Sequence, residues 1–201
     1  MRLRLLAVLF VLALLVVLVV PATAFAATAQ MTVYATSTGS SSALNTSGHA
    51  WISIKNTSSA DLSVLGFSLK PGSELYLGTY GNLSNGNGLY WSHEPYAATH
   101  QGETYTGRVS LTQDISSSQL TTVTNWVKAH NLWTLIGNCS WFAASAWDTV
   151  AVNKVSAGRF IPTPSQLKAS ISSLSGWVLN KPWGTWGSSW GRYSSSSSGA
   201  W

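Results

Sequence analysis

An apolar run near the start of the chain most constrains the fold, because it separates an export leader from the residues that fold. Arg2 and Arg4 precede residues 5–20, which are all apolar, and Ala24 and Ala26 form an Ala-x-Ala pattern behind them. These are the three parts of a secretory signal peptide. An uncleaved anchor is the alternative, but the run is shorter than the about 20 residues that a spanning helix needs. We predict that residues 1–26 are removed and that the protein is secreted or associated with the cell wall.

Cleavage there leaves 201 − 26 = 175 residues, enough for one domain with its own core. Of the 11 Lys and Arg residues, two leave with the leader, so nine remain against six Asp and Glu. These nine are scattered along the chain, which gives no basic patch of the kind that binds nucleic acid. We expect no nucleic-acid partner and no membrane contact after cleavage, and the oligomeric state stays open.

The cysteine count bears on both fold and chemistry. The chain has a single cysteine, Cys139, so no disulfide can form within it. Exported proteins usually use cysteines in pairs. A lone cysteine in such a protein indicates either a reactive thiol or pairing with another chain. The alternative is a buried, inert residue that acts as a small apolar side chain.

Composition divides the mature chain into three segments. Residues 27–47 are rich in Thr, Ser and Ala and are expected to be a linker with one short strand at 31–35. Residues 48–178 carry the patterned sequence of a folded domain. Residues 179–201 combine Trp-Gly repeats with a run of serines, a composition typical of disordered segments.

The domain's pattern predicts strands first and helices later, which favours an α+β fold. Residues 49–54 alternate with period two, and with residues 62–69 they are expected to form a hairpin. Ser116 is a good N-cap for a helix whose apolar face carries Leu120, Val123 and Val127. A second helix is expected to begin at Asn138 or Cys139, and a third shortly after Pro162.

The tail has two interpretations. Tryptophan rings spaced along a flexible segment can stack on sugar rings, which would tether the protein to a glycan or to the wall. The other interpretation is a low-complexity extension that binds nothing.

One thiol and one imidazole could supply the chemistry of the domain. A thiol in the first turn of a helix has a lowered pKa, because free amides and the helix dipole favour the thiolate. Such a nucleophile also needs a base, usually a histidine. Of the four histidines, His49 is the best placed, because it opens a strand directly after Gly48. The alternatives are a structural histidine and an inert cysteine.

Two short motifs resemble one family. Residues 48–52, Gly-His-Ala-Trp-Ile, resemble the His strand of the permuted papain-like (NlpC-type) cysteine peptidases and acyltransferases, in which the His strand precedes the Cys helix. Residues 137–142, Gly-Asn-Cys-Ser-Trp-Phe, resemble the family's Asn-Cys turn into the nucleophile helix. The resemblance covers about residues 48–172. It implies a permuted papain-like domain with an antiparallel sheet packed on the Cys-bearing helix.

The resemblance also implies roles for individual residues. Cys139 would be the nucleophile and His49 the base. The family adds a third polar residue on the strand after the histidine to orient the imidazole. Of the candidates in that region, Asp61, Ser63 and Ser68, the carboxylate of Asp61 has the most suitable chemistry. No cofactor is expected, and one cysteine with widely separated histidines gives no zinc-ligand spacing.

Two functions follow as hypotheses. The first is a secreted Cys–His hydrolase that cleaves an amide or ester bond through an acyl-enzyme, with a peptide or peptidoglycan-type substrate suggested by the compartment and the resemblance. The second is a non-enzymatic binding or cell-surface interaction protein, with the Trp-rich tail as its adhesive part. The first requires a reactive thiol at Cys139, and the second does not.

Overall fold

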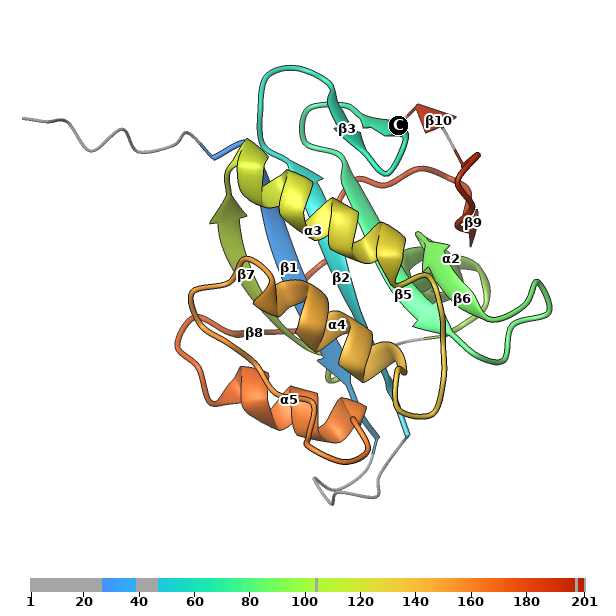
Figure 1. Cartoon of the computed structure of the whole chain (residues 1–201), viewed down its shortest axis with the longest axis vertical. Helices are drawn as coiled ribbons and strands as arrows, with labels where there is room; N and C mark the ends of the chain where they lie inside the picture. Colours follow the sequence, from blue (N-terminus) through green and yellow to red (C-terminus); the bar gives the residue numbers. More distant parts are fainter. Residues whose placement is uncertain (1–26, 39–46, 104, 198, 201) are drawn as a thin grey trace, which may run out of the picture.

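The computed structural model describes residues 27–38, 47–103, 105–197 and 199–200 (Figure 1). The predicted export leader, residues 1–26, lies outside the described residues. Within the described part of the chain, no helix is both long and apolar enough to cross a bilayer. The fold is α+β, with a mostly antiparallel sheet and four helices among these residues.

The main sheet has seven strands in the order β8-β7-β1-β2-β5-β6-β9, and every neighbouring pair is antiparallel. A smaller sheet has the order β10-β4-β3. The strands are β1 (Ala29–Thr36), β2 (His49–Asn56), β3 (Leu62–Val64), β4 (Phe67–Leu69), β5 (Glu74–Tyr80), β6 (Gly88–Trp91), β7 (Val109–Ile115), β8 (Val178–Leu179), β9 (Gly191–Arg192) and β10 (Gly199–Ala200). The helices are α2 (His93–His100), α3 (Ser117–Ala129), α4 (Cys139–Asp148) and α5 (Pro164–Ser172).

The core lies between the sheet and the three later helices. Figure 1 shows α3, α4 and α5 on one face of the sheet, with α4 in the middle. Alternate residues of the central strands enter this core, among them Val33, Ile52 and Leu75, and Phe142 meets them from α4. Period-two alternation therefore decides which side chains face the helices.

The helix starts follow from their capping residues. Ser116 accepts the Gln119 amide while the Gln119 side chain accepts the Ser116 amide, so α3 begins with a capping box. Leu120, Val123 and Val127 are buried, as predicted. The predicted start of α4 is also confirmed, with Asn138 as its N-cap.

The predicted hairpin between residues 49–54 and 62–69 was wrong. Residues 62–69 instead form their own hairpin, β3 with β4, and β2 pairs with β1 and β5. The physical reason is a tight turn at Leu65 and Gly66, both with left-handed backbone angles, which divides the expected strand in two.

The segment predicted as a linker supplies a central strand. β1 lies between β2 and β7, and its residues Ala29 to Thr36 are mostly buried. The folded domain therefore begins near residue 29 and not at Gly48. The composition was misleading because the small Ala and Thr side chains of β1 fit a strand covered on both faces.

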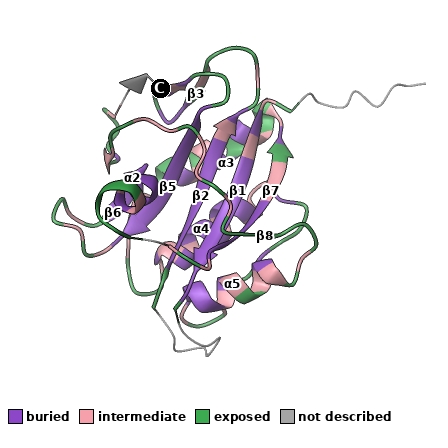
Figure 2. Ribbon diagram, turned by 180° about the vertical axis from the view of Figure 1, so that it is seen from behind, coloured by how far each residue is buried: buried purple, intermediate pink, exposed green. Residues whose placement is uncertain are grey.

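The C-terminal segment does not stand apart from the domain as its composition suggested. It adds β8 to β7 at one edge of the sheet and β9 to β6 at the other. In Figure 2 this segment crosses the face opposite α3 and α4. Trp183 stacks on Trp51 at a ring-centroid distance of 5.9 Å. The prediction of a separate low-complexity tail from residue 179 was therefore wrong as to structure.

Candidate active site

His49 is the first residue of β2 and is placed by the glycine before it. Gly48 has a left-handed φ of 121°, and a Cβ atom there would lie 2.1 Å from the Thr36 carbonyl oxygen. Only glycine fits this close approach. β2 therefore begins tightly against β1, and the His49 ring stacks on Trp51 at 5.5 Å and lies 4.4 Å from the Tyr80 ring.

Cys139 is the first residue of α4, and Asn138 holds the turn that presents it. The Asn138 side-chain oxygen accepts the amides of Ser140 and Trp141, while its nitrogen donates to the carbonyls of Leu135 and Pro162. The Cys139 amide belongs to the first turn of α4, where amides have no partner within the helix. The helix therefore presents a thiol and a free amide at its positive end.

The thiol and the imidazole meet at the end of the sheet. Cys139 is hydrogen-bonded to His49 and also accepts the Ala50 amide. Burial favours the neutral thiol, but the hydrogen bond and charge of His49 outweigh it and lower the pKa of Cys139 below its usual value. Burial likewise opposes a charge on His49, whereas its bonds to Cys139 and Glu94 raise the pKa of His49 to about 9. Both shifts favour a thiolate–imidazolium pair.

Glu94 completes the group from the first turn of α2. Its Oε1 lies 3.0 Å from His49 Nε2, which leaves Nδ1 of the ring for Cys139. Tyr80 donates a second hydrogen bond to the same oxygen at 3.0 Å. Glu94 is fully buried. A buried carboxylate in this place fixes the orientation of the imidazole and stabilises its charged form.

A glycine on β5 makes room for that carboxylate. Gly78 of β5 lies opposite Trp51 of β2 in the strand register. A Cβ atom at Gly78 would lie 2.0 Å from Glu94 Oε1 and 3.0 Å from His49 Nε2. β5 therefore has no side chain beside the imidazole of His49, and α2 supplies the carboxylate of Glu94 from outside the sheet.

The structure places Asp61 away from this site, so its proposed role as the orienting residue needs correction. Asp61 is exposed next to β3, where it bonds Lys70 Nζ at 2.6 Å and Ser68 at 3.3 Å. Because β3 and β4 leave the main sheet to form a separate hairpin, Asp61 does not follow β2 in space.

The sequence contained a signal for Glu94 that was overlooked. Glu94 and Pro95 follow Ser92, and an acidic residue with a proline is typical of a first helical turn. Its neighbour His93 contacts Tyr80 at 4.6 Å, and burial lowers the pKa of His93. Among the described residues, no cluster of His, Cys, Asp and Glu has the arrangement of a metal site.

The Cys139–His49 pair opens into a cavity of about 810 Å³. His49, Cys139 and Tyr105 line it together with Trp133 from the loop before α4. Trp133 packs directly against Gly81, where a Cβ atom would fall 2.2 Å from the ring. The cavity is large enough for a peptide-sized group and gives it direct access to the thiol.

Comparisons of the chain with protein-family models, with curated proteins and with solved structures found no match.

Proposed function

We propose that this protein is a secreted Cys–His hydrolase of permuted papain-like fold that cleaves an amide or ester bond through a covalent acyl-enzyme. One observation carries the proposal: Cys139, His49 and Glu94 form a continuous hydrogen-bonded series beside an open cavity. Nucleophile, base and orienting group stand in the order that nucleophilic catalysis requires.

The arrangement of elements supports the proposed fold. The histidine strand β2 lies within an antiparallel sheet, and the cysteine helix α4 packs across β1, β2 and β5. The histidine precedes the cysteine in the chain, as in the permuted members of the papain-like class. This chain departs from their pattern in one respect, because its third residue comes from a helix and not from the strand that follows.

In the proposed mechanism, the Cys139 thiolate attacks the carbonyl carbon of the scissile bond and forms a tetrahedral oxyanion. The free Cys139 amide at the start of α4 is positioned to donate to that oxygen. The His49 imidazolium then gives its proton to the leaving amine or alkoxide as the bond breaks. A thioester of Cys139 remains, and His49 is left neutral.

Water completes the cycle. Neutral His49 takes a proton from a water molecule, which attacks the thioester carbonyl, and collapse of the second tetrahedral intermediate expels the thiolate. The acid product leaves and the imidazolium is restored. Glu94 keeps its hydrogen bond to His49 and stabilises the charged form of the imidazole in both halves.

The substrate class rests on compartment and resemblance. A chain that opens with an export signal meets cell-wall material outside the cytoplasm, so peptidoglycan-type stem peptides are the substrates to test first. The cavity, at about 810 Å³, has room for a peptide segment, and Thr38 and Pro164 line it together with Cys139.

The test is a pair of substitutions in the mature protein, followed by release of new amino groups from purified cell-wall peptides. Cys139→Ala and His49→Ala should each abolish release and leave the fold intact by circular dichroism. An active Cys139→Ala protein would overturn the proposal. A wild-type thiol that reacts with iodoacetamide only near the ordinary pKa of about 8.5 would also overturn it, and would favour a binding protein.

A further inference from the structure

Glu94 can serve His49 only while α2 keeps its place, and α2 is poorly equipped to hold that place alone. It has only eight residues, and Ser92 at its start has a left-handed φ of 51° with no side-chain hydrogen bond to the helix. Its fully apolar buried residues are limited to Pro95 and Ala97. A short, uncapped helix with little apolar surface needs tertiary contacts to persist.

The buried carboxylate on α2 makes such tertiary contacts more necessary. Glu94 is a buried carboxylate, and its Oε2 has no hydrogen-bond partner among the described residues. Burying an incompletely bonded carboxylate is unfavourable, so the side chain gains free energy by moving toward water. Something outside α2 must therefore oppose that movement.

Trp190, from the C-terminal segment, packs on the outer side of α2. Its ring meets His93 edge-on at 4.6 Å and lies 5.5 Å from the ring of Tyr96, one turn further along. His93 also contacts Tyr80 at 4.6 Å. The His93 ring thus meets both Trp190 and Tyr80, the residue that donates to Glu94.

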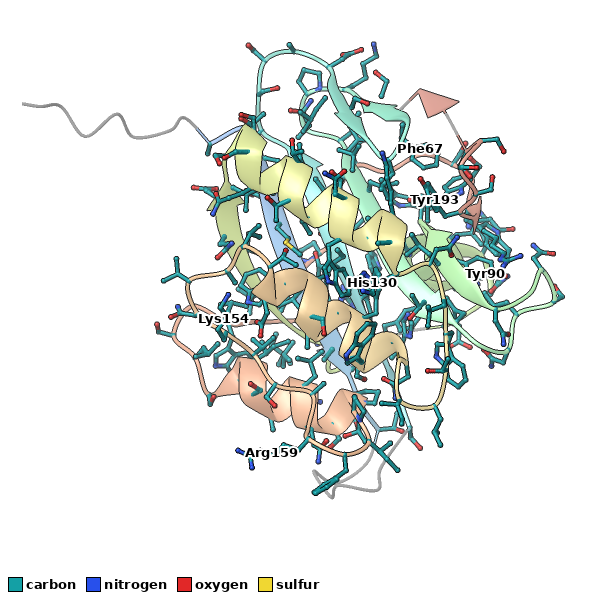
Figure 3. The ribbon with its side chains drawn as sticks, in the orientation of Figure 1. Phe67, Tyr90, His130, Lys154, Arg159 and Tyr193 are labelled. Atoms are coloured by element: carbon teal, nitrogen blue, oxygen red, sulfur yellow. The ribbon has the colours of Figure 1, made fainter. Side chains whose placement is uncertain are left out.

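The main chain directly after Trp190 is fixed to the sheet. Gly191 pairs with Trp91, directly before the start of α2, and the Tyr193 amide donates to the Leu89 carbonyl at 2.8 Å. Figure 3 shows Tyr90 and Tyr193 on the same side of the molecule, where β9 lies along β6. The ring of Trp190 is therefore held by an anchored strand.

We propose that Trp190 is a positioning residue for the Cys–His pair, and that the C-terminal segment is thereby a working part of the active site. The inference rests on the proposed function. Trp190 does not itself line the cavity. It contacts His93, which does, and through His93 it holds α2 and keeps Glu94 on His49.

Loss of the ring has a defined chemical consequence. With α2 released, Glu94 moves toward water and His49 loses its acceptor at Nε2. The pKa of His49 then falls and the pKa of Cys139 rises, because each charge stabilises the other. A rise of one unit in the thiol pKa lowers the thiolate fraction about tenfold at a pH well below that pKa.

The experiment uses the full mature chain and the pH dependence of Cys139 alkylation by iodoacetamide, with thermal unfolding to confirm the fold. Trp190→Ala should lower the alkylation rate at pH 6.5 about tenfold or more, whereas Trp190→Phe, which keeps an aromatic ring, should retain most of it. Trp177→Ala is the matched control, because Trp177 is 39% exposed and lies before β8. In a Glu94→Gln background, Trp190→Ala should cause no further loss.

The outcomes separate the two proposals. An unchanged alkylation profile in folded Trp190→Ala, beside an activated wild-type thiol, would overturn the role of Trp190 alone. A full additional loss in the Glu94→Gln background would overturn it too, because the two residues would then act separately. If Trp190→Ala does not fold, Trp190→Leu should shift the profile in the same direction. An ordinary wild-type thiol would overturn the proposed function, and with it the inference.

Discussion

Replacing Gly78 with alanine tests the geometry of the site directly. The new methyl group would lie 2.0 Å from Glu94 Oε1 and 3.0 Å from His49 Nε2, so the carboxylate must leave the imidazole. The strand backbone cannot move away, because Gly78 pairs with Trp51 on one side and with Tyr90 on the other. We expect Glu94 to rotate while β5 stays in place.

The magnitude follows from the bond that is lost. A hydrogen bond to a charged group contributes about 1.5–3 kcal/mol. If the bond between His49 and Glu94 supports the reactive pair by that amount, its loss slows hydrolysis about 10- to 150-fold. The alkylation profile of Cys139 should also move toward the ordinary thiol value of about 8.5.

A matched control exists in the same molecule. A Cβ atom at Gly184 would also lie 2.0 Å from a carboxylate oxygen, in this case Oε2 of Glu74. Gly184→Ala therefore creates a similar steric conflict without touching His49. Hydrolysis and thiol alkylation at pH 6.5 should fall in Gly78→Ala and stay near wild type in Gly184→Ala. A folded Gly78→Ala protein with the wild-type profile would refute the assignment of Glu94.

Three further predictions concern pH, Asp61 and the start of α3. Hydrolysis should fall on the acid side, where the pH crosses the depressed pKa of Cys139 and the thiolate is protonated. It should fall again above about pH 9, where His49 loses the proton that it gives to the leaving group. Glu94→Gln should move this alkaline limb to lower pH, and an unmoved limb in pH–rate profiles would contradict the assignment. Asp61→Asn should leave activity unchanged, because the Asp61 carboxylate bonds only Lys70 and Ser68 among the described residues, and a loss of turnover would restore it as a candidate. Ser116→Ala removes the capping box of α3 and should lower the free energy of unfolding by about 1 kcal/mol with activity retained, as urea denaturation can measure.

Local signals predicted the parts of the site that depend on neighbouring residues. The Gly48–His49 strand start and the Asn138 cap before Cys139 are both patterns within a few residues, and both elements form where expected. Their contact across ninety residues was suggested by a resemblance, because no local pattern specifies it.

Long-range features were not predicted, and each has a physical reason. Glu94 reaches His49 because Gly78 leaves a gap, and a gap in a sheet is not visible in a linear pattern. β1 is buried on both faces of the sheet, so its Ala and Thr residues lack the alternation that marks a half-exposed strand. The tail folds because the sheet offers aromatic partners, although its own composition is that of a disordered segment.

The order of the strands in the sheet determines when, during folding, the active site becomes complete. β1, the first described strand, lies between β2 and β7, while the final segment pairs with β7, β6 and β4. Contacts between residues so distant in sequence form late and slowly. A chain that has emerged only through α4 contains both Cys139 and His49 but lacks β8 and β9. If Trp190 holds α2 as proposed, full catalytic activity appears only once the last segment has closed over the sheet, so an incomplete chain has a less reactive thiol.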